Sequence, residues 1–157
     1  MRSLREGIEA GNGPSSYRHS SKRPTTIKAS SFMTEDVYVL HGDQSIAEAI
    51  QMLVKRRISG APVLGDQGKL EGILSEYDCM KALAASSFHH EGMPMMRQVK
   101  DLMTRDLHAV EPDTDLFSIA HLFVDQRIRR VPVVSANKLV GLISRRDVLR
   151  VMGELYT

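Results

Sequence analysis

The sequence predicts an α+β fold in which two tandem β-α-β-β-α units pack as a pseudo-twofold pair. The first observation is an internal repeat, because residues 32–34 (Phe-Met-Thr) return as residues 102–104 (Leu-Met-Thr). The second is that residues 70–78 (Leu-Glu-Gly-Ile-Leu-Ser-Glu-Tyr-Asp) return as residues 139–147 (Leu-Val-Gly-Leu-Ile-Ser-Arg-Arg-Asp). Because a repeat of this kind sets the architecture, a binding site is expected between the two copies or mirrored in both.

The two copies keep the same register except in one turn. Residues 58–64 (Ile-Ser-Gly-Ala-Pro-Val-Leu) return as residues 128–134 (Ile-Arg-Arg-Val-Pro-Val-Val). One residue is then deleted where residues 65–68 face residues 135–137. Surface turns tolerate such changes of length, so the two copies are expected to share one backbone.

The first half of each unit is predicted to be a strand followed by a helix. Short apolar runs at residues 37–40 and 107–110 are typical of strands. Ser45 followed by Glu48 forms a capping box, which marks a helix start. Apolar residues then recur at helical spacing, which predicts one buried face on each helix. These residues are Ile46, Ala49, Ile50, Leu53 and Val54 in the first unit and Leu116, Ile119, Ala120, Phe123 and Val124 in the second.

The second half of each unit is predicted to be a hairpin followed by a helix. The expected elements are residues 61–64, 70–74 and 76–85 in the first unit and residues 131–134, 139–143 and 145–155 in the second. Proline has no N–H to donate to a strand ladder, so Pro62 and Pro132 are expected at a strand start or at a sheet edge.

The chain divides into four parts. Residues 1–28 form a basic tail rich in Gly, Ser and Pro, which cannot bury enough apolar surface to order and is expected to be flexible. Residues 29–85 form the first repeat, residues 86–98 a linker and residues 99–157 the second repeat. The net charge of +2 is uneven, because the first 30 residues carry six Lys/Arg against two Glu.

Several classes of function are disfavoured. The repeats are nearly neutral, whereas a nucleic-acid-binding face needs many clustered cations, so only a weak contact of the basic tail with a polyanion stays open. No run approaches the roughly 20 apolar residues that span a bilayer, and the N-terminus has no apolar segment of secretory type, so a cytoplasmic protein without membrane contact is expected. The alternative is an organelle transit segment, because the N-terminus contains Ser and Arg, although Glu6 and Glu9 count against it. No nucleophile–base motif is present, so an enzyme is not expected.

Cysteine and histidine residues suggest neither redox nor metal chemistry. Cys79, which lies in an apolar helical stretch, is expected to be a buried and inert thiol. His89 and His90 are adjacent, next to Glu91, but they lack further ligands at useful spacing. No metal and no required cofactor are therefore expected.

The repeated strings resemble a cystathionine-β-synthase (CBS) domain pair, also called a Bateman module, over residues 30–153. The matching features are the Met-Thr opening, the Pro-Val strand and the Gly-containing strand that ends in Ser-x-x-Asp. The resemblance implies two units packed through their sheets, with two quasi-symmetric clefts, and a disc-shaped homodimer of such pairs. It also implies a regulatory module that binds AMP, ADP, ATP or S-adenosylmethionine and modulates a partner protein, which the sequence does not identify.

The resemblance implies that Asp78 and Asp147 anchor the ribose of the ligand, with Ser75 and Ser144 beside them. Each of these pairs is expected where a strand passes into a helix, and the N–H groups of a helix start also attract phosphate. The same residue types stabilise a helix start by themselves, so a purely structural role is the alternative. In that case the chain would be a dimerisation module with vestigial clefts.

The two clefts are expected to differ in charge. By resemblance, Arg129, Arg130 and Arg146 bind phosphate groups in the cleft of Asp147, because a guanidinium can clamp phosphate oxygens. The alternative is that these arginines form a solvated face or bind acidic residues of a second copy.

The cleft of Asp78 is expected to take a less anionic adenosyl ligand, or none, because the first repeat supplies Ser59 and Tyr77 at the corresponding places. The adenine is expected in an apolar slot in which an aromatic ring can stack on the base. The expected lining residues are Thr34, Val37, Tyr38 and Ile58 for the Asp147 cleft and Thr104, His108 and Ile128 for the Asp78 cleft.

Overall fold

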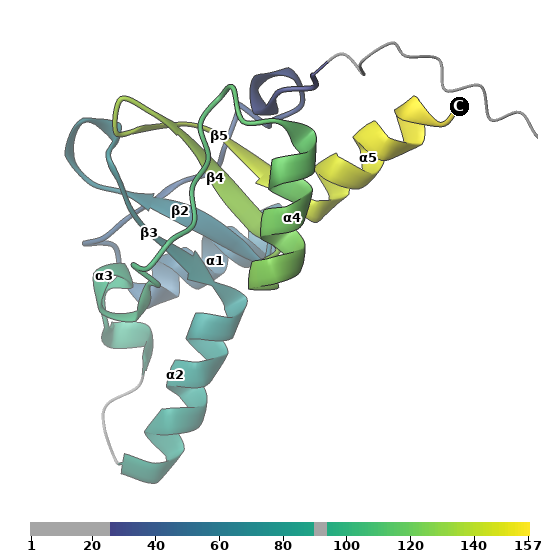
Figure 1. The fold of residues 1–157 in the computed structure, drawn as a ribbon. Helices are drawn as coiled ribbons and strands as arrows, with labels where there is room; N and C mark the ends of the chain where they lie inside the picture. The colour runs from purple at the N-terminus through teal and green to yellow at the C-terminus, as the bar shows by residue number, and fades with distance from the viewer. Residues whose placement is uncertain (1–25, 90–93) are drawn as a thin grey trace, which may run out of the picture.

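The computed structural model describes residues 26–89 and 94–157 (Figure 1). Its elements follow the predicted β-α-β-β-α order, except that the first strand of the second repeat is reduced to a single bridge. The tail up to residue 25 and the His90–Glu91 pair lie outside the described residues. The first repeat contains β1 (Leu40–His41), α1 (Ile46–Arg56), β2 (Gly60–Leu64), β3 (Leu70–Ser75) and α2 (Glu76–His89). The second contains α4 (Leu116–Gln126), β4 (Arg130–Ser135), β5 (Lys138–Ser144) and α5 (Arg145–Leu155). Short helices are η1 (Ala29–Ser31), η2 (Asp66–Gly68), η3 (Pro94–Met96) and α3 (Val99–Leu102).

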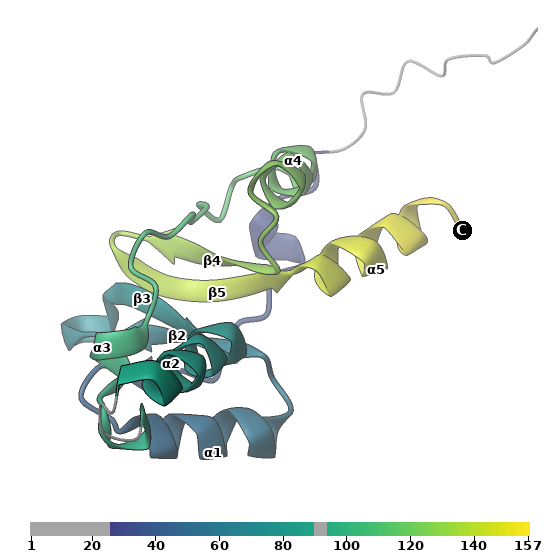
Figure 2. The same ribbon diagram turned by 90° about the horizontal axis from the view of Figure 1, so that it is seen from below.

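Two antiparallel hairpins form the centre of the molecule. Figure 2 shows β4 and β5 lying over β2 and β3, with α1 and α2 on one outer side and α4 on the other. A bridge between Lys69 and Lys138 joins the turn ends of the two hairpins. The α+β architecture of two tandem repeats is therefore confirmed.

The register change falls in the hairpin turns, as the sequence predicts. Ala136 and Asn137, which connect β4 to β5, both have positive φ, the conformation of a tight type I′ turn. The longer turn of the first repeat contains η2 and has positive φ at Gln67 and Gly68. The extra residue is accommodated without moving the strands that follow.

The first strand of each repeat is shorter than predicted. Residues 37–39 are not in a strand, and the run at 107–110 contributes one bridge, from Val110 to Val133. The physical reason is the proline in the neighbouring strand. The carbonyl of Pro132 accepts from the N–H of Val110 at 2.9 Å, so its nitrogen faces the same side and has no hydrogen to give to the carbonyl of His108. Pro132 thus lies inside β4. Pro62 lies inside β2, the central strand of the sheet β1-β2-β3, so the prediction of a strand start or a sheet edge is wrong for Pro62.

The capping box predicts the start of α1 correctly. The hydroxyl of Ser45 accepts from the N–H of Glu48 at 3.2 Å, and the Glu48 carboxylate accepts from the N–H of Ser45 at 3.1 Å. The predicted buried face is too wide, because Val54 and Val124 are 72% and 74% exposed. The helix predicted over residues 76–85 continues to His89, into the predicted linker.

The two repeats exchange short segments. Ala29 and Phe32, which open the first repeat, are buried in the core of the second repeat with Ile119, Val131 and Ile143. In the same way, Val99 and Met103 are buried in the core of the first repeat. Each core is therefore completed by the opening segment of the other repeat, and this exchange holds the two units together.

The exchanged segments end in the Met-Thr pairs. Thr34 and Leu142 exchange two backbone hydrogen bonds of 2.9 Å, and Thr104 and Ile73 exchange two of 2.9 and 3.0 Å. Gly141 is required at its position because a Cβ there would meet the Met33 side chain, with Cγ at 2.9 Å. The Met of the Met-Thr opening therefore packs directly against the Gly of the third strand.

Candidate functional site

A cavity of about 470 Å³ lies between the two repeats, at the start of α2. Its lining residues come from both repeats, and most of them are the sequence-predicted site residues. The predicted residues among them are Ser59, Ser75, Tyr77, Asp78, Thr104, His108, Ile128, Arg129 and Arg130.

Asp78 is the buried anionic group of this cavity, with 5% of its surface exposed. Its Oδ2 accepts from the N–H and the hydroxyl of Ser75, both at 2.9 Å, and these bonds fix the carboxylate at the helix start. Its Oδ1 accepts from the hydroxyl of Thr104 at 3.2 Å. Thr104 belongs to the second repeat and reaches the cavity through the exchanged segment. The carboxylate keeps further acceptor capacity, because each oxygen can accept two hydrogen bonds.

Arg130 crosses from the second repeat to the first. Its guanidinium donates to the hydroxyl of Ser59 and occupies the space that a Cβ on Gly60 would fill. Burial is the main cause that lowers the pKa of Arg130, and the positive charge of Arg129 lowers it further, while Glu76 opposes both. The group stays protonated, so this wall of the cavity presents a partly buried cation.

Arg129 lies at the more exposed mouth of the cavity. Its guanidinium is 3.9 Å from the Glu76 carboxylate, and both side chains are more than half exposed. Exposed pairs of this kind contribute little to stability, so Arg129 can exchange Glu76 for an anionic ligand at small cost.

The prediction that Arg129 and Arg130 belong to the cleft of Asp147 is wrong, because both line the cavity of Asp78. The reason is the alternation of side chains along a strand. Val131 and Val133 point into the core of the second repeat, so Arg130 points to the opposite face, toward the first repeat. The cleft of Asp78 is consequently the one that contains the arginines.

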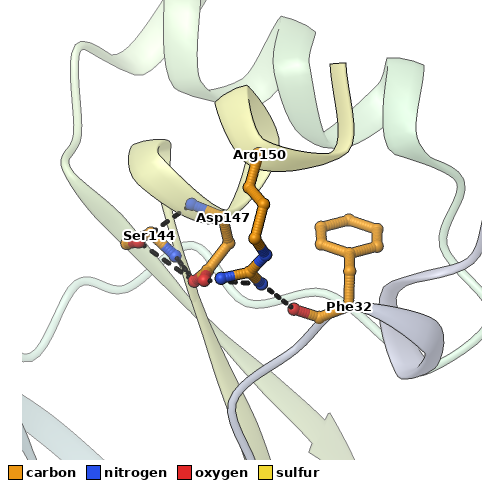
Figure 3. A network of polar contacts seen from close by, with 4 residues as sticks. All are labelled: Phe32, Ser144, Asp147 and Arg150. Atoms are coloured by element: carbon orange, nitrogen blue, oxygen red, sulfur yellow. Dashed lines mark hydrogen bonds and ion pairs between the residues drawn. The ribbon is translucent and has the colours of Figure 1, made fainter. Parts of the chain in front are cut away.

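Asp147 has the same helix-start geometry but a different neighbour (Figure 3). Its Oδ2 accepts from the N–H and hydroxyl of Ser144 at 2.8 and 3.0 Å. Its Oδ1 lies 3.1 Å from the guanidinium of Arg150, which also donates to the Phe32 carbonyl at 3.5 Å. Asp147 is not among the residues that line the 470 Å³ cavity.

Apart from Arg129 and Arg130, the residues predicted for the cleft of Asp147 do not line this cavity. The guanidinium of Arg56 lies 4.6 Å from the ring centre of Tyr38, where an adenine was expected to stack. Ile58 packs against the first core and lines a separate apolar cavity of about 600 Å³ between α1 and α2. Thr34, Val37 and Arg146 do not line the 470 Å³ cavity either, and Arg146 is exposed on α5.

The lining contains residues that the sequence reading did not select as ligand contacts. They are Ile73, Glu76, Met80, Asp106, Leu107 and Arg127. Arg127 has positive φ at the end of α4, as Arg57 has at the end of α1, and that helix end directs the chain into the cleft. The sequence signal that could have identified Arg127 is its position directly before the Ile-Arg-Arg string.

Metal and membrane signals are absent from the described parts of the chain. Residues 26–89 and 94–157 contain no group of three His, Cys, Asp or Glu side chains arranged to hold a metal ion. No helix in these two ranges is long and apolar enough to cross a membrane. Cys79 is half-buried, and burial together with the charge of Asp78 raises the pKa of its thiol.

The chain is similar to known proteins and to solved structures. It is 31% identical to the chloroplastic CBS domain-containing protein CBSX1 of Arabidopsis thaliana, over 83% of this chain and 66% of that protein. The crystal structure of CBSX2 in complex with AMP is 30% identical, with a TM-score of 0.74, over 83% of this chain and 99% of that one. The CBS domain pair of MJ0100, in complex with 5′-methylthioadenosine and S-adenosyl-L-methionine, is 26% identical, with a TM-score of 0.72, over 83% and 99%.

The family assignment follows from two matched regions. The chain spans between 23% and 66% of the length of the first three curated relatives that it matches. The CBS domain family matches twice, at residues 29–85 and 99–154, which together form most of the chain. This protein therefore belongs to the CBS domain family and contains a tandem pair of CBS domains.

Proposed function

We propose that this chain is a regulatory module that binds an adenosine-containing ligand in the cavity of Asp78. One observation carries the proposal: a buried carboxylate, Asp78, and a partly buried cation, Arg130, line the same cavity between the two repeats. A carboxylate can accept two hydrogen bonds from a ribose diol, and a guanidinium can bind a phosphate. The binding of AMP by CBSX2 supports the same ligand class.

The charges of the cavity favour a ligand with a small anionic group. The cavity is lined by three cations and three carboxylates, so the charges of its lining are balanced: Arg127, Arg129 and Arg130 with Glu76, Asp78 and Asp106. A triphosphate would bring more negative charge than this lining accommodates. We expect AMP, or S-adenosylmethionine with its amino and carboxylate groups, to bind better than ATP.

The ligand would act by shifting the balance between two arrangements of the repeats. The cavity is closed on one side by the helix start of α2 and on the other by the start of β4. A ligand that contacts Asp78 and Arg130 together favours the arrangement in which both can reach it. The surface that contacts an unidentified partner protein would then depend on whether ligand is bound. The module would regulate that partner without catalysing a reaction.

We also propose a homodimer that forms through the outer helices. Apolar side chains are exposed at equivalent positions of both repeats, including Val54 on α1, Val124 on α4 and Leu149 on α5. Exposed apolar faces of this extent are typical of interaction surfaces. Sedimentation of Val54→Glu/Val124→Glu should show a monomer where the unchanged chain sediments as a dimer, and a monomeric unchanged chain would contradict the dimer.

The ligand proposal is tested by thermal unfolding of the full chain with AMP, ATP and S-adenosylmethionine. A ligand at one hundred times its dissociation constant adds about 2.7 kcal/mol to the free energy of unfolding. We expect AMP or S-adenosylmethionine to raise the melting temperature, and Arg130→Met to weaken AMP more than adenosine. If none of the three ligands raises it, a structural dimerisation module with vestigial clefts is the better description.

A cytoplasmic location stays a prediction of the proposal. It is checked by fractionation of cells that produce the full chain.

A further inference from the structure

The two helix starts that follow the hairpins have the same internal geometry. At α2, the Oδ2 of Asp78 accepts from the N–H and hydroxyl of Ser75, both at 2.9 Å. At α5, the Oδ2 of Asp147 accepts from the N–H and hydroxyl of Ser144 at 2.8 and 3.0 Å. Both carboxylates are buried, with 5% and 8% of the residue surface exposed. The two aspartates can therefore be compared directly, because their helix starts are alike.

The two helix starts differ in the partner of the other carboxylate oxygen, Oδ1. The Oδ1 of Asp78 accepts from a neutral hydroxyl, that of Thr104, at 3.2 Å. The Oδ1 of Asp147 instead pairs with the Arg150 guanidinium at 3.1 Å (Figure 3). The hydroxyl of Thr104 is a neutral donor, whereas the guanidinium of Arg150 is a cation that occupies the Oδ1 of Asp147.

The neighbouring residues explain why only one aspartate is paired. Lys81 occupies on α2 the position that Arg150 has on α5, three residues after the aspartate. Its ammonium group lies over the ring of Tyr77, 5.6 Å from the ring centre. The residue equivalent to Tyr77 is Arg146, a cation, which repels Arg150 and offers it no such site.

Arg150 is also tied to the exchanged segment. Its guanidinium donates to the carbonyl of Phe32 at 3.5 Å, and Phe32 is buried in the core of the second repeat. The side chain thus joins α5 to the segment that leads into Thr34, the counterpart of Thr104. It contacts the Oδ1 of Asp147, the oxygen equivalent to the one that Thr104 contacts at Asp78.

We propose that Arg150 closes the Asp147 position to ribose, so that the chain binds one adenosyl ligand, at Asp78. This inference rests on the proposed function and adds its stoichiometry and the residue that sets it. A diol at Asp147 must displace a charged hydrogen-bonding partner, whereas a diol at Asp78 displaces only the neutral hydroxyl of Thr104. The two sites, alike in sequence, are unlike in affinity because of one side chain.

The test is calorimetric titration of the full chain with AMP and, separately, with S-adenosylmethionine. The unchanged chain should bind one ligand, with any second ligand at least about tenfold weaker. Arg150→Met should bind two, and the matched control Lys81→Met should still bind one. Asp78→Asn should bind none, whereas Asp78→Asn/Arg150→Met should regain one ligand. Arg150→Gln, which keeps a hydrogen-bond donor but removes the charge, should also bind two ligands. It replaces Arg150→Met in the test if the methionine variant does not unfold cooperatively.

Three results would overturn this inference while leaving the proposed function intact. They are two ligands of similar affinity on the unchanged chain, a single ligand on both Arg150 variants, or one ligand still bound by Asp78→Asn. A chain that binds neither AMP nor S-adenosylmethionine in any variant would overturn the proposed function together with this inference.

Discussion

Thr104 donates its hydroxyl to the Oδ1 of Asp78 at 3.2 Å, although the two residues belong to different repeats. The backbone of Thr104 is held at the same time by two hydrogen bonds to Ile73, on the strand that leads to Asp78. The segment exchange therefore brings the Met-Thr opening of one repeat to the Ser-x-x-Asp ending of the other. The candidate binding site exists only when both repeats are folded together.

Replacing the two aspartates separately should distinguish ligand binding from helix capping. Asp78→Asn and Asp147→Asn should each lower the free energy of unfolding by about 1 kcal/mol, because each carboxylate caps a helix with the same geometry. Only Asp78→Asn should also abolish the AMP-induced rise in melting temperature. Thermal unfolding with and without AMP measures both effects, and an equal loss of the AMP effect in the two variants would contradict the assignment of the site.

Gly60→Ala should both destabilise the protein and weaken AMP binding. The new Cβ would lie 2.9 Å from the Leu74 carbonyl and would collide with the guanidinium of Arg130. We expect a loss of about 1–3 kcal/mol in urea unfolding, as for other overpacked positions.

The matched control for this variant is Gly153→Ala on α5. A Cβ at Gly153 meets no atom within 4 Å, and alanine favours a helix over glycine by up to about 1 kcal/mol. The control should be stabilised and should bind AMP unchanged. Unchanged AMP affinity in Gly60→Ala would show that Arg130 does not act on the ligand.

The two exchanged segments should differ in how far a Met→Ala substitution restores the stability that a Gly→Ala substitution removes. Gly141→Ala should be destabilising, and Met33→Ala should relieve much of the added cost, because Met33 side-chain atoms are the nearest to the new Cβ. Gly72→Ala should resist rescue by Met103→Ala, because the backbone carbonyl of Thr104 lies 2.9 Å from the new Cβ.

Two double-mutant cycles in urea unfolding measure these couplings. We expect a coupling of about 1 kcal/mol or more for the Gly141–Met33 pair and a smaller one for Gly72–Met103. Equal couplings in the two cycles would be inconsistent with the contacts described here.

Cys79 should react slowly with iodoacetamide. Burial and, to a smaller degree, the negative charge of Asp78 raise the pKa of its thiol, so at pH 8 less thiolate is present than in a free cysteine. Asp78→Asn removes the charge and should speed alkylation slightly, whereas Asp147→Asn should not. Mass spectrometry over time measures the rate, and a rate equal to that of free cysteine at pH 8 would disprove the raised pKa.

Local sequence patterns predicted the elements well where the determining contacts are local. The capping box at Ser45, the hairpins and the Ser-x-x-Asp helix starts depend on residues within a few positions of each other, and all are present in the structure. The first strands were overpredicted because apolar runs do not reveal that the neighbouring strand contains a proline without an N–H.

The site was predicted less completely, because its geometry depends on which face of a strand is covered. Arg129 and Arg130 were chosen as anion-binding residues from their place in the repeat, but they were assigned to the wrong aspartate. The sequence does not show that Arg130 points across to Ser59, since this follows from how one hairpin lies over the other. The pairing of Arg150 with Asp147 was missed although it is a local contact, since side chains three residues apart on one helix are neighbours.

By itself, the sequence determined the repeated β-α-β-β-α units, the capped helix starts and the residue types available for a nucleoside and an anion. Those features depend on spacing along the chain and on side-chain chemistry, which a single sequence displays. The tertiary structure alone decided that each repeat completes the core of the other and that the arginines face Asp78. The physical reason is that burial of apolar faces sets the stacking of the two hairpins, and that stacking sets which charged side chains meet.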